Sequence, residues 1–242
     1  MTINLNANSG ATGATIPLGP PQTQPATIPT TPGVAASTLP PMTLTVKKKL
    51  PSGVASNVKQ HVLFLLDHSS SMAGDKIMEL DLAMASILAT LGDADNKDGF
   101  RVTIIPFNHG SSVLCSAVPA TAVPALNLVA SGGTNFDSPI KAAIAEIDAF
   151  KALPNPDGWH FLQPQVLFLS DGQARISDAN IQDLQERATV TAVAYGSDAN
   201  QATLARIASD GQVHVVGTNG GALRGFMAQV GATMVSTMKA AI

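Results

Sequence analysis

The sequence predicts an α/β fold with a doubly wound, mostly parallel central sheet, one antiparallel edge strand and helices on both faces. Short apolar runs of strand length alternate with segments whose apolar residues recur every three or four positions. Such alternation favours a parallel sheet, because each crossover helix packs back onto the sheet. Residues 61–66 are apolar without interruption after His61, which is typical of a strand covered on both faces.

The elements follow in order from residue 61. After the first strand we expect a helix over residues 74–91, then a strand over residues 100–107. Residues 111–118 predict the antiparallel strand, joined to its neighbour by the hairpin Asn108-His109-Gly110. The later elements are a helix marked by Ile140, Ile144 and Ile147, a strand over 165–169, a short helix over 181–187, a strand over 190–195, a helix over 199–208, a last strand over 212–216, and a terminal helix with an apolar stripe from Leu223 to Met238.

Composition divides the chain near residue 46. Residues 1–46 hold eight of the sixteen prolines and no charged side chain. This segment buries too little apolar surface to offset chain entropy, so we expect a tail that is disordered alone or ordered on a partner. Residues 42–46 alternate as an edge strand does. We assign residues 47–60 to a linker and residues 61–242 to the folded domain.

Charge and composition exclude several classes of function. The net charge of −3 and the aromatic content of 4% disfavour a nucleic-acid partner. One cysteine, Cys115, rules out a disulfide within the chain and disfavours a cysteine metal site. The N-terminus lacks the pattern of a secretory signal, and no apolar run approaches the roughly 18 to 20 residues of a membrane span. We therefore expect a cytoplasmic protein without a membrane partner.

Three polar loops each come directly after a predicted strand or turn. They are Asp67-His68-Ser69-Ser70-Ser71, Ser131-Gly132-Gly133-Thr134 and Ser170-Asp171-Gly172. Ligands of an open α/β sheet bind outside the carboxyl ends of the strands, where the strand order reverses. If the strands before the first and third loops are neighbours, Asp67 and Asp171 meet there.

The candidate ligands in these loops are the carboxylates of Asp67 and Asp171 and the hydroxyls of Ser69, Ser71 and Thr134. Asp67, Ser69 and Ser71 alternate along an extended turn, and Gly132-Gly133 lets the backbone bring Thr134 close. All-oxygen donors suit a hard cation, chiefly Mg²⁺ or Mn²⁺. Three neutral hydroxyls leave the ion undercompensated, so it would attract an incoming carboxylate.

At these positions the sequence resembles the von Willebrand factor A family. The family's metal-ion-dependent adhesion site reads D-x-S-x-S, then a Thr, then an Asp in a strand-end D-G, and the matching residues are Asp67, Ser69, Ser71, Thr134 and Asp171. The resemblance covers about residues 58–240 and implies a Rossmann-like fold. It further implies that Ser69 and Ser71 bind the ion directly, that Asp67 and Asp171 act partly through waters, and that Thr134 enters or leaves the shell with conformation. The spacing and the loop Asp157-Gly158-Trp159 look like the bacterial tellurium-resistance-associated subgroup.

Structural explanations compete with these assignments. Asp67 and Ser69 are also suited to cap the following helix. His68 and His109 are expected to be exposed loop residues and not ligands. Residues 93–99 imitate a calcium loop, but Lys97 stands where an EF-hand requires Asp, so we expect a solvated helix-to-strand connection.

These observations favour a metal-dependent protein–protein interaction module, a subunit of a bacterial hetero-complex that captures a partner's Asp or Glu. The alternatives are a metal-dependent hydrolase on a similar sheet and a scaffold whose metal has no role in binding. We expect no enzyme, because His68 is the only candidate base and no lysine accompanies the motif to neutralise a phosphate.

Overall fold

The computed structural model describes residues 57–219 and 221–241. The expected tail over residues 1–46, its strand over 42–46 and most of the expected linker lie outside the described residues. In the part that is described, no helix combines the length and apolar character needed to cross a membrane.

The described residues build a seven-stranded sheet whose main path runs β3-β2-β1-β5-β6-β7. All neighbouring strands are parallel except β3, which runs antiparallel to β2 at one edge. The strands are β1 (Val58–Asp67), β2 (Phe100–Phe107), β3 (Cys115–Pro119), β4 (His160–Phe161), β5 (Gln165–Ser170), β6 (Thr189–Tyr195) and β7 (Val213–Val216). The helices are α1 (Asp75–Leu91), α2 (Asp137–Lys151), α3 (Asp178–Arg187), α4 (Gln201–Ile207) and α5 (Ala222–Ala240).

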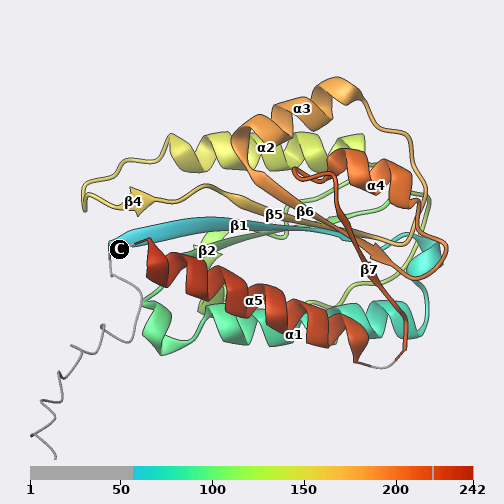
Figure 1. Cartoon of the computed structure of the whole chain (residues 1–242), viewed down its shortest axis with the longest axis horizontal. Helices are drawn as coiled ribbons and strands as arrows, with labels where there is room; N and C mark the ends of the chain where they lie inside the picture. Colours follow the sequence, from blue (N-terminus) through green and yellow to red (C-terminus); the bar gives the residue numbers. More distant parts are fainter. Residues whose placement is uncertain (1–56, 220, 242) are drawn as a thin grey trace, which may run out of the picture. The chain divides into compact units, whose positions relative to one another are not determined.

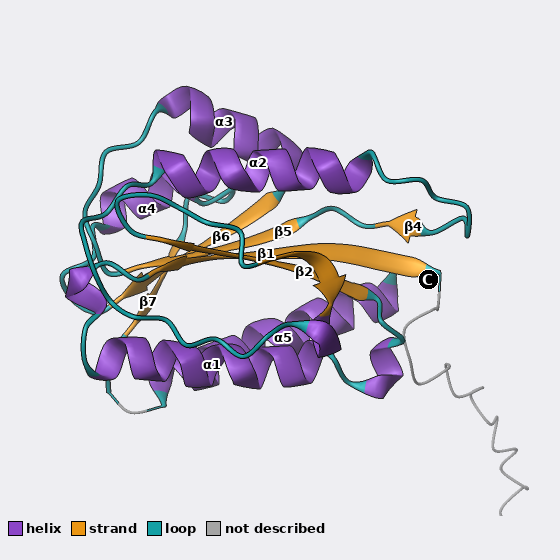
Figure 2. Ribbon diagram, turned by 180° about the vertical axis from the view of Figure 1, so that it is seen from behind, coloured by secondary structure: helices purple, strands orange, loops and turns teal. Residues whose placement is uncertain are grey.

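Helices cover both faces of the sheet (Figures 1 and 2). Helices α1 and α5 lie side by side on one face, and α2, α3 and α4 lie on the other. The strand β1 is buried along its whole length because alternate side chains enter two cores. Phe64 and Leu66 join the core beneath α1 and α5, whereas Leu63 and Leu65 join the core beneath the other three helices. The predicted fold class is therefore confirmed.

The structure departs from the prediction mainly in two boundaries and one additional strand. The strand β1 begins at Val58, so residues 58–60 belong to the sheet and not to a linker. The antiparallel strand β3 covers only Cys115–Pro119, and residues 111–114 contribute one isolated bridge from Ser111 to Phe107. The two-residue strand β4 pairs in parallel with Val58 and Lys59 and was not predicted, because two residues carry no periodic pattern.

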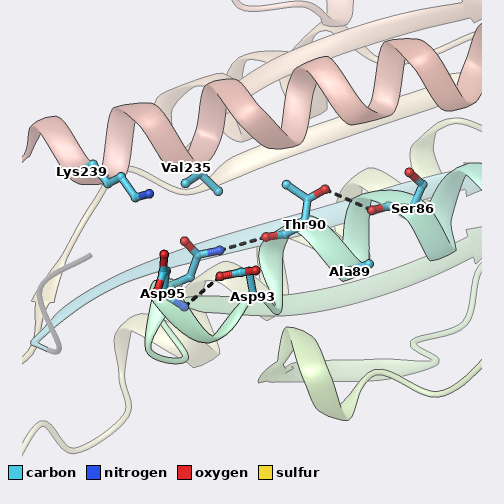
Figure 3. Close-up of a pocket in the computed structure, with 8 residues that line it drawn as sticks. Ser86, Ala89, Thr90, Asp93, Asp95, Val235 and Lys239 are labelled. Atoms are coloured by element: carbon cyan, nitrogen blue, oxygen red, sulfur yellow. Dashed lines mark hydrogen bonds between the residues drawn. The ribbon is translucent and has the colours of Figure 1, made fainter. Parts of the chain in front are cut away.

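The connection between α1 and β2 is a structural loop, as predicted. Asp93 Oδ1 accepts a hydrogen bond from Asp95 N at 2.9 Å, and the buried Asn96 donates to the carbonyls of Thr90 and Leu91. The loop lines a hollow of about 640 Å³ between the ends of α1 and α5, where Lys239 also lies (Figure 3). Its side chains satisfy nearby backbone groups, as a helix-to-strand connection requires.

The strand order places a switch point between β1 and β5. The chain leaves β1 toward β2 on one side and later returns to add β5, β6 and β7 on the other. β1 and β5 pair in parallel from Val62 with Gln165 to Leu66 with Leu169, so their carboxyl ends lie together. Asp67 and Ser170 close these two strands, and the crevice beyond them is where α/β sheets bind ligands.

Candidate metal centre

The first loop holds its carboxylate by backbone and hydroxyl groups. Asp67 is the last residue of β1 and is fully buried. Its Oδ1 accepts a hydrogen bond from Ser69 N at 2.8 Å, and its Oδ2 accepts one from Ser170 Oγ at 2.5 Å. The side chain of Asp67 therefore spans the ends of β1 and β5.

The hydroxyls of Ser69 and Ser71 join the first loop to the third. Their Oγ atoms lie 3.1 Å apart, and Ser71 Oγ donates to Asp171 Oδ1 at 2.7 Å. Ser69 and Asp171 are buried, whereas Ser71 is exposed. Two carboxylates and two hydroxyls thus converge at the switch point, with Ser71 on the solvent side.

Thr134 lies beside Gly172 at the same switch point. A Cβ atom at Gly172 would lie 2.9 Å from Thr134 Oγ1 and 3.3 Å from Asp67 Oδ2, so both side chains border the space beside Gly172. Ser70 N donates to Gly132 O at 3.0 Å and Ser131 N donates to His68 O at 2.8 Å, which fixes the second loop against the first. The structure brings all five predicted site residues together.

Burial dominates the electrostatics of Asp67. Loss of solvent raises the pKa of this carboxyl above its ordinary value, and the charge of Asp171 adds to the rise. The hydrogen bonds from Ser170 and Ser69 act in the opposite direction. Two buried carboxylates side by side are costly unless a cation lies nearby.

A cation does lie nearby, although none was predicted from the sequence. Lys76 Nζ lies 2.5 Å from Asp171 Oδ2 and 3.3 Å from Asp198 Oδ1. Burial lowers the pKa of Lys76, but its hydrogen bonds to Asp171 and Asp198 and the charges of the two carboxylates outweigh that effect and raise it. The expectation that no lysine accompanies the motif is therefore wrong. The first turn of α1 begins at the carboxyl end of β1, which brings Lys76 back to the third loop.

The two histidines near the loops are engaged elsewhere. His68 Nδ1 lies 2.9 Å from the carbonyl oxygen of Val129, and His109 is exposed on the loop after β2. A Cβ at Gly132 would lie 2.8 Å from His109 Nδ1, so this ring packs against the backbone of the second loop. Neither imidazole is hydrogen-bonded to any of the five site residues. His109 is exposed as expected, whereas His68 is half-buried.

Hard cations prefer such a set of donors. The converging groups are carboxylate and hydroxyl oxygens, which suit Mg²⁺ or Mn²⁺ better than softer metals. Within the described residues no three His, Cys, Asp or Glu side chains cluster in a metal-binding arrangement, so the hydroxyls are essential to the set. The residues fit a hard cation on their chemistry and on their convergence.

Parts of this chain are similar in sequence to known proteins. An uncharacterized protein of Methanocaldococcus jannaschii is 26% identical over 133 residues, which cover 53% of this chain and 28% of that protein. The human inter-alpha-trypsin inhibitor heavy chain H4 is 26% identical over 176 residues, 66% of this chain and 18% of that protein. The chain thus spans less than a third of the length of these relatives.

The fold also matches solved structures. Proximal thread matrix protein 1 from the mussel byssus, in a form with a zinc-occupied MIDAS motif, superposes with a TM-score of 0.56 at 16% identity, covering 74% of this chain and 48% of that one. The family model for the von Willebrand factor type A domain matches residues 61–220. On the fold, the converging loops and this match, the chain belongs to the von Willebrand factor type A domain family.

Proposed function

We propose that Asp67, Ser69, Ser71, Thr134 and Asp171 hold one Mg²⁺ or Mn²⁺ ion, through which the protein captures a carboxylate of a partner protein. The observation that carries this proposal is the chain of contacts from Ser69 Oγ to Ser71 Oγ and on to Asp171 Oδ1, at 3.1 and 2.7 Å. These groups present oxygen atoms, which are the ligands that hard cations prefer. When bound, the ion would supply a concentrated positive charge with a position open to an anionic oxygen.

The buried and the exposed residues of the site have different roles. Asp67 and Asp171 are buried and fixed by hydrogen bonds, so they hold negative charge at a constant place. Ser71 is exposed and Thr134 is half-buried, so the hydroxyl side of the site faces the approaching partner. The site is therefore suited to binding an anionic group from solution.

The arrangement supports an interaction module over a hydrolase. Metal-assisted hydrolysis needs a positioned base or nucleophile. His68 directs Nδ1 toward the Val129 carbonyl. Lys76 is paired with two carboxylates, which stabilise its protonated form and make it a poor base. We further propose a subunit of a bacterial, cytoplasmic hetero-complex with residues 1–46 as a second tether.

Calorimetry with Mg²⁺ and Mn²⁺ on the full chain tests the metal site. We expect one ion per chain in the wild type and at least about a hundredfold weaker binding in Asp67→Ala, which loses one of two charged ligands. The matched control is Asp95→Ala, because Asp95 is an exposed carboxylate in the loop between α1 and β2. Equal affinity in wild type and Asp67→Ala would overturn the site.

A pulldown from the native host, with Mg²⁺ or with EDTA, tests partner capture. We expect one set of proteins to bind the wild type in Mg²⁺ and to be lost both with EDTA and in Asp67→Ala. Metal binding without a metal-dependent partner would favour the scaffold. Turnover of phosphate esters that is lost in Asp67→Ala would favour the hydrolase.

A further inference from the structure

Lys76 contacts two carboxylates that belong to different loops. Its Nζ lies 2.5 Å from Asp171 Oδ2 and 3.3 Å from each oxygen of Asp198. The side chain of Asp171 has no exposed surface, that of Lys76 is 19% exposed and that of Asp198 is 57% exposed. The lysine thus bridges a buried site carboxylate and a solvated one.

The contact with Lys76 occupies the second oxygen of Asp171. Its first oxygen accepts a hydrogen bond from Ser71, so both oxygens of this carboxylate are engaged. An ammonium within hydrogen-bond distance of Asp171 also repels any other cation held by the same carboxylate. Lys76 is therefore placed to oppose metal binding at Asp171.

Asp198 provides a second place for the same ammonium. Gly196 packs closely against both partners: a Cβ there would lie 2.9 Å from Asp198 Oδ1 and 3.4 Å from Lys76 Nζ. The loop of Asp198 is attached to the third site loop, because Gln173 Nε2 donates to Asp198 O at 3.3 Å and Asn200 N donates to Gly172 O at 3.4 Å. Lys76 can leave Asp171 without losing a carboxylate partner.

We propose that Lys76 is a positioning residue that competes with the metal ion for Asp171 and transfers to Asp198 when the ion binds. This inference rests on the metal site proposed above. The lysine keeps Asp171 neutralised and in place while the site holds no ion. It lowers the affinity of the site for the metal ion, and the position of the Asp198 loop determines the size of this reduction.

Calorimetry with Mn²⁺ on the full chain tests the competition. We expect Lys76→Met to bind the ion about tenfold more tightly than the wild type, because a charge beside the ion is removed. Lys76→Arg keeps the charge and should stay near the wild-type affinity. Lys151→Met is the matched control, since Lys151 is an exposed lysine in the last turn of α2. Lys76→Gln repeats the neutralisation with a polar side chain, in case methionine perturbs folding.

A double-mutant cycle tests the transfer. Asp198→Asn removes the negative charge of the second partner, so Lys76 favours Asp171, and we expect Mn²⁺ affinity to fall about threefold or more. In the Lys76→Met background the same change should cost much less. An equal loss in both backgrounds would show that Asp198 acts independently of Lys76 and would overturn the transfer.

The outcomes separate this inference from the metal site itself. Wild-type binding that Asp67→Ala abolishes, together with unchanged affinity in Lys76→Met and Lys76→Gln, would overturn the competition and leave the site intact. Absence of binding in the wild type and in both neutral variants would overturn the metal site and the role of Lys76 with it.

Discussion

The two ends of β1 bury opposite charges and hold them by different means. At the carboxyl end, serine hydroxyls and the Lys76 ammonium contact Asp67 and Asp171. At the amino end, Lys59 Nζ donates to the carbonyl of Asp98 at 3.1 Å and lies 5.3 Å from the centre of the Trp159 ring. Burial lowers the pKa of Lys59, and the nearby charge of Arg101, 5.4 Å from the same ring, lowers it further.

The difference distinguishes a structural cluster from a binding site. Carbonyls and ring faces at the amino end are parts of the fold itself. Hydroxyls and a flexible lysine at the carboxyl end can rotate away and leave oxygens for a ligand. We therefore expect changes at the amino end to alter stability alone, and changes at the carboxyl end to alter metal affinity.

The largest expected effect is a pH dependence of stability that originates at the amino end. Burial lowers the pKa of His61 to about 4, and Nδ1 of this ring has no hydrogen-bond partner among the described residues. In the unfolded chain the His61 imidazole protonates near pH 6.5. The free energy of unfolding is therefore highest above pH 6.5, and it falls as the pH drops from 6.5 toward 4, because only the unfolded chain binds the proton there. We expect a loss of about 3 kcal/mol over this window.

Urea unfolding at several pH values measures the loss. His61→Gln should show a flatter profile between pH 6.5 and 4, whereas His214→Gln, at an exposed histidine of β7, should follow the wild type. Equal slopes for His61→Gln and the wild type would show that the buried imidazole is not the cause.

The second effect belongs to the carboxyl end. An ion that binds only the folded chain stabilises it, and at a hundred times its Kd the gain is about 2.7 kcal/mol. Thermal melts in Mg²⁺ and in EDTA should show this gain for the wild type and Trp159→Leu. The gain should vanish in Asp67→Ala. A Mg²⁺ gain that survives Asp67→Ala would place the ion elsewhere.

The third effect tests the amino end without touching the site. Trp159 stacks with Lys59 and Arg101 and packs edge-on against Phe161 at 6.2 Å. We expect Trp159→Leu to destabilise the fold by about 2 kcal/mol, with Mn²⁺ affinity unchanged. Circular dichroism is the suitable probe, because the substitution removes the chain's single tryptophan. A change in metal affinity would break the comparison between the two ends.

The smallest effect concerns spacing inside the site. A Cβ at Gly172 would lie 2.9 Å from Thr134 Oγ1, so Gly172→Ala should displace Thr134 and weaken Mn²⁺ binding about tenfold, or about 1.4 kcal/mol. Gly225→Ala is the control, because a Cβ there meets no atom within 4 Å and Gly225 lies in α5, outside the three site loops. If both variants bind alike in calorimetry, the position of Thr134 is unimportant to the ion.

Patterns that repeat over many residues were predicted well from the sequence. Continuous apolar runs identified β1 and β5. Asp67 and Asp171 were expected to meet only if these two strands are neighbours, and the structure shows that they are. The contact of Lys76 with Asp171 was not predicted, because it depends on the direction of the first turn of α1, which the spacing within the motif does not encode. A search for charged residues in the first turn of the helix after D-x-S-x-S would have found it.

The contact between Ser71 and Asp171 joins residues one hundred positions apart. It forms only after β5 has paired in parallel with β1, and parallel pairing across long stretches of chain is slow. A growing polypeptide therefore lacks the complete set of oxygens until residue 171 has been synthesised and the centre of the sheet is closed. Acquisition of the ion would then show that β1 and β5 have paired, and a copy truncated before residue 171 would lack part of the site.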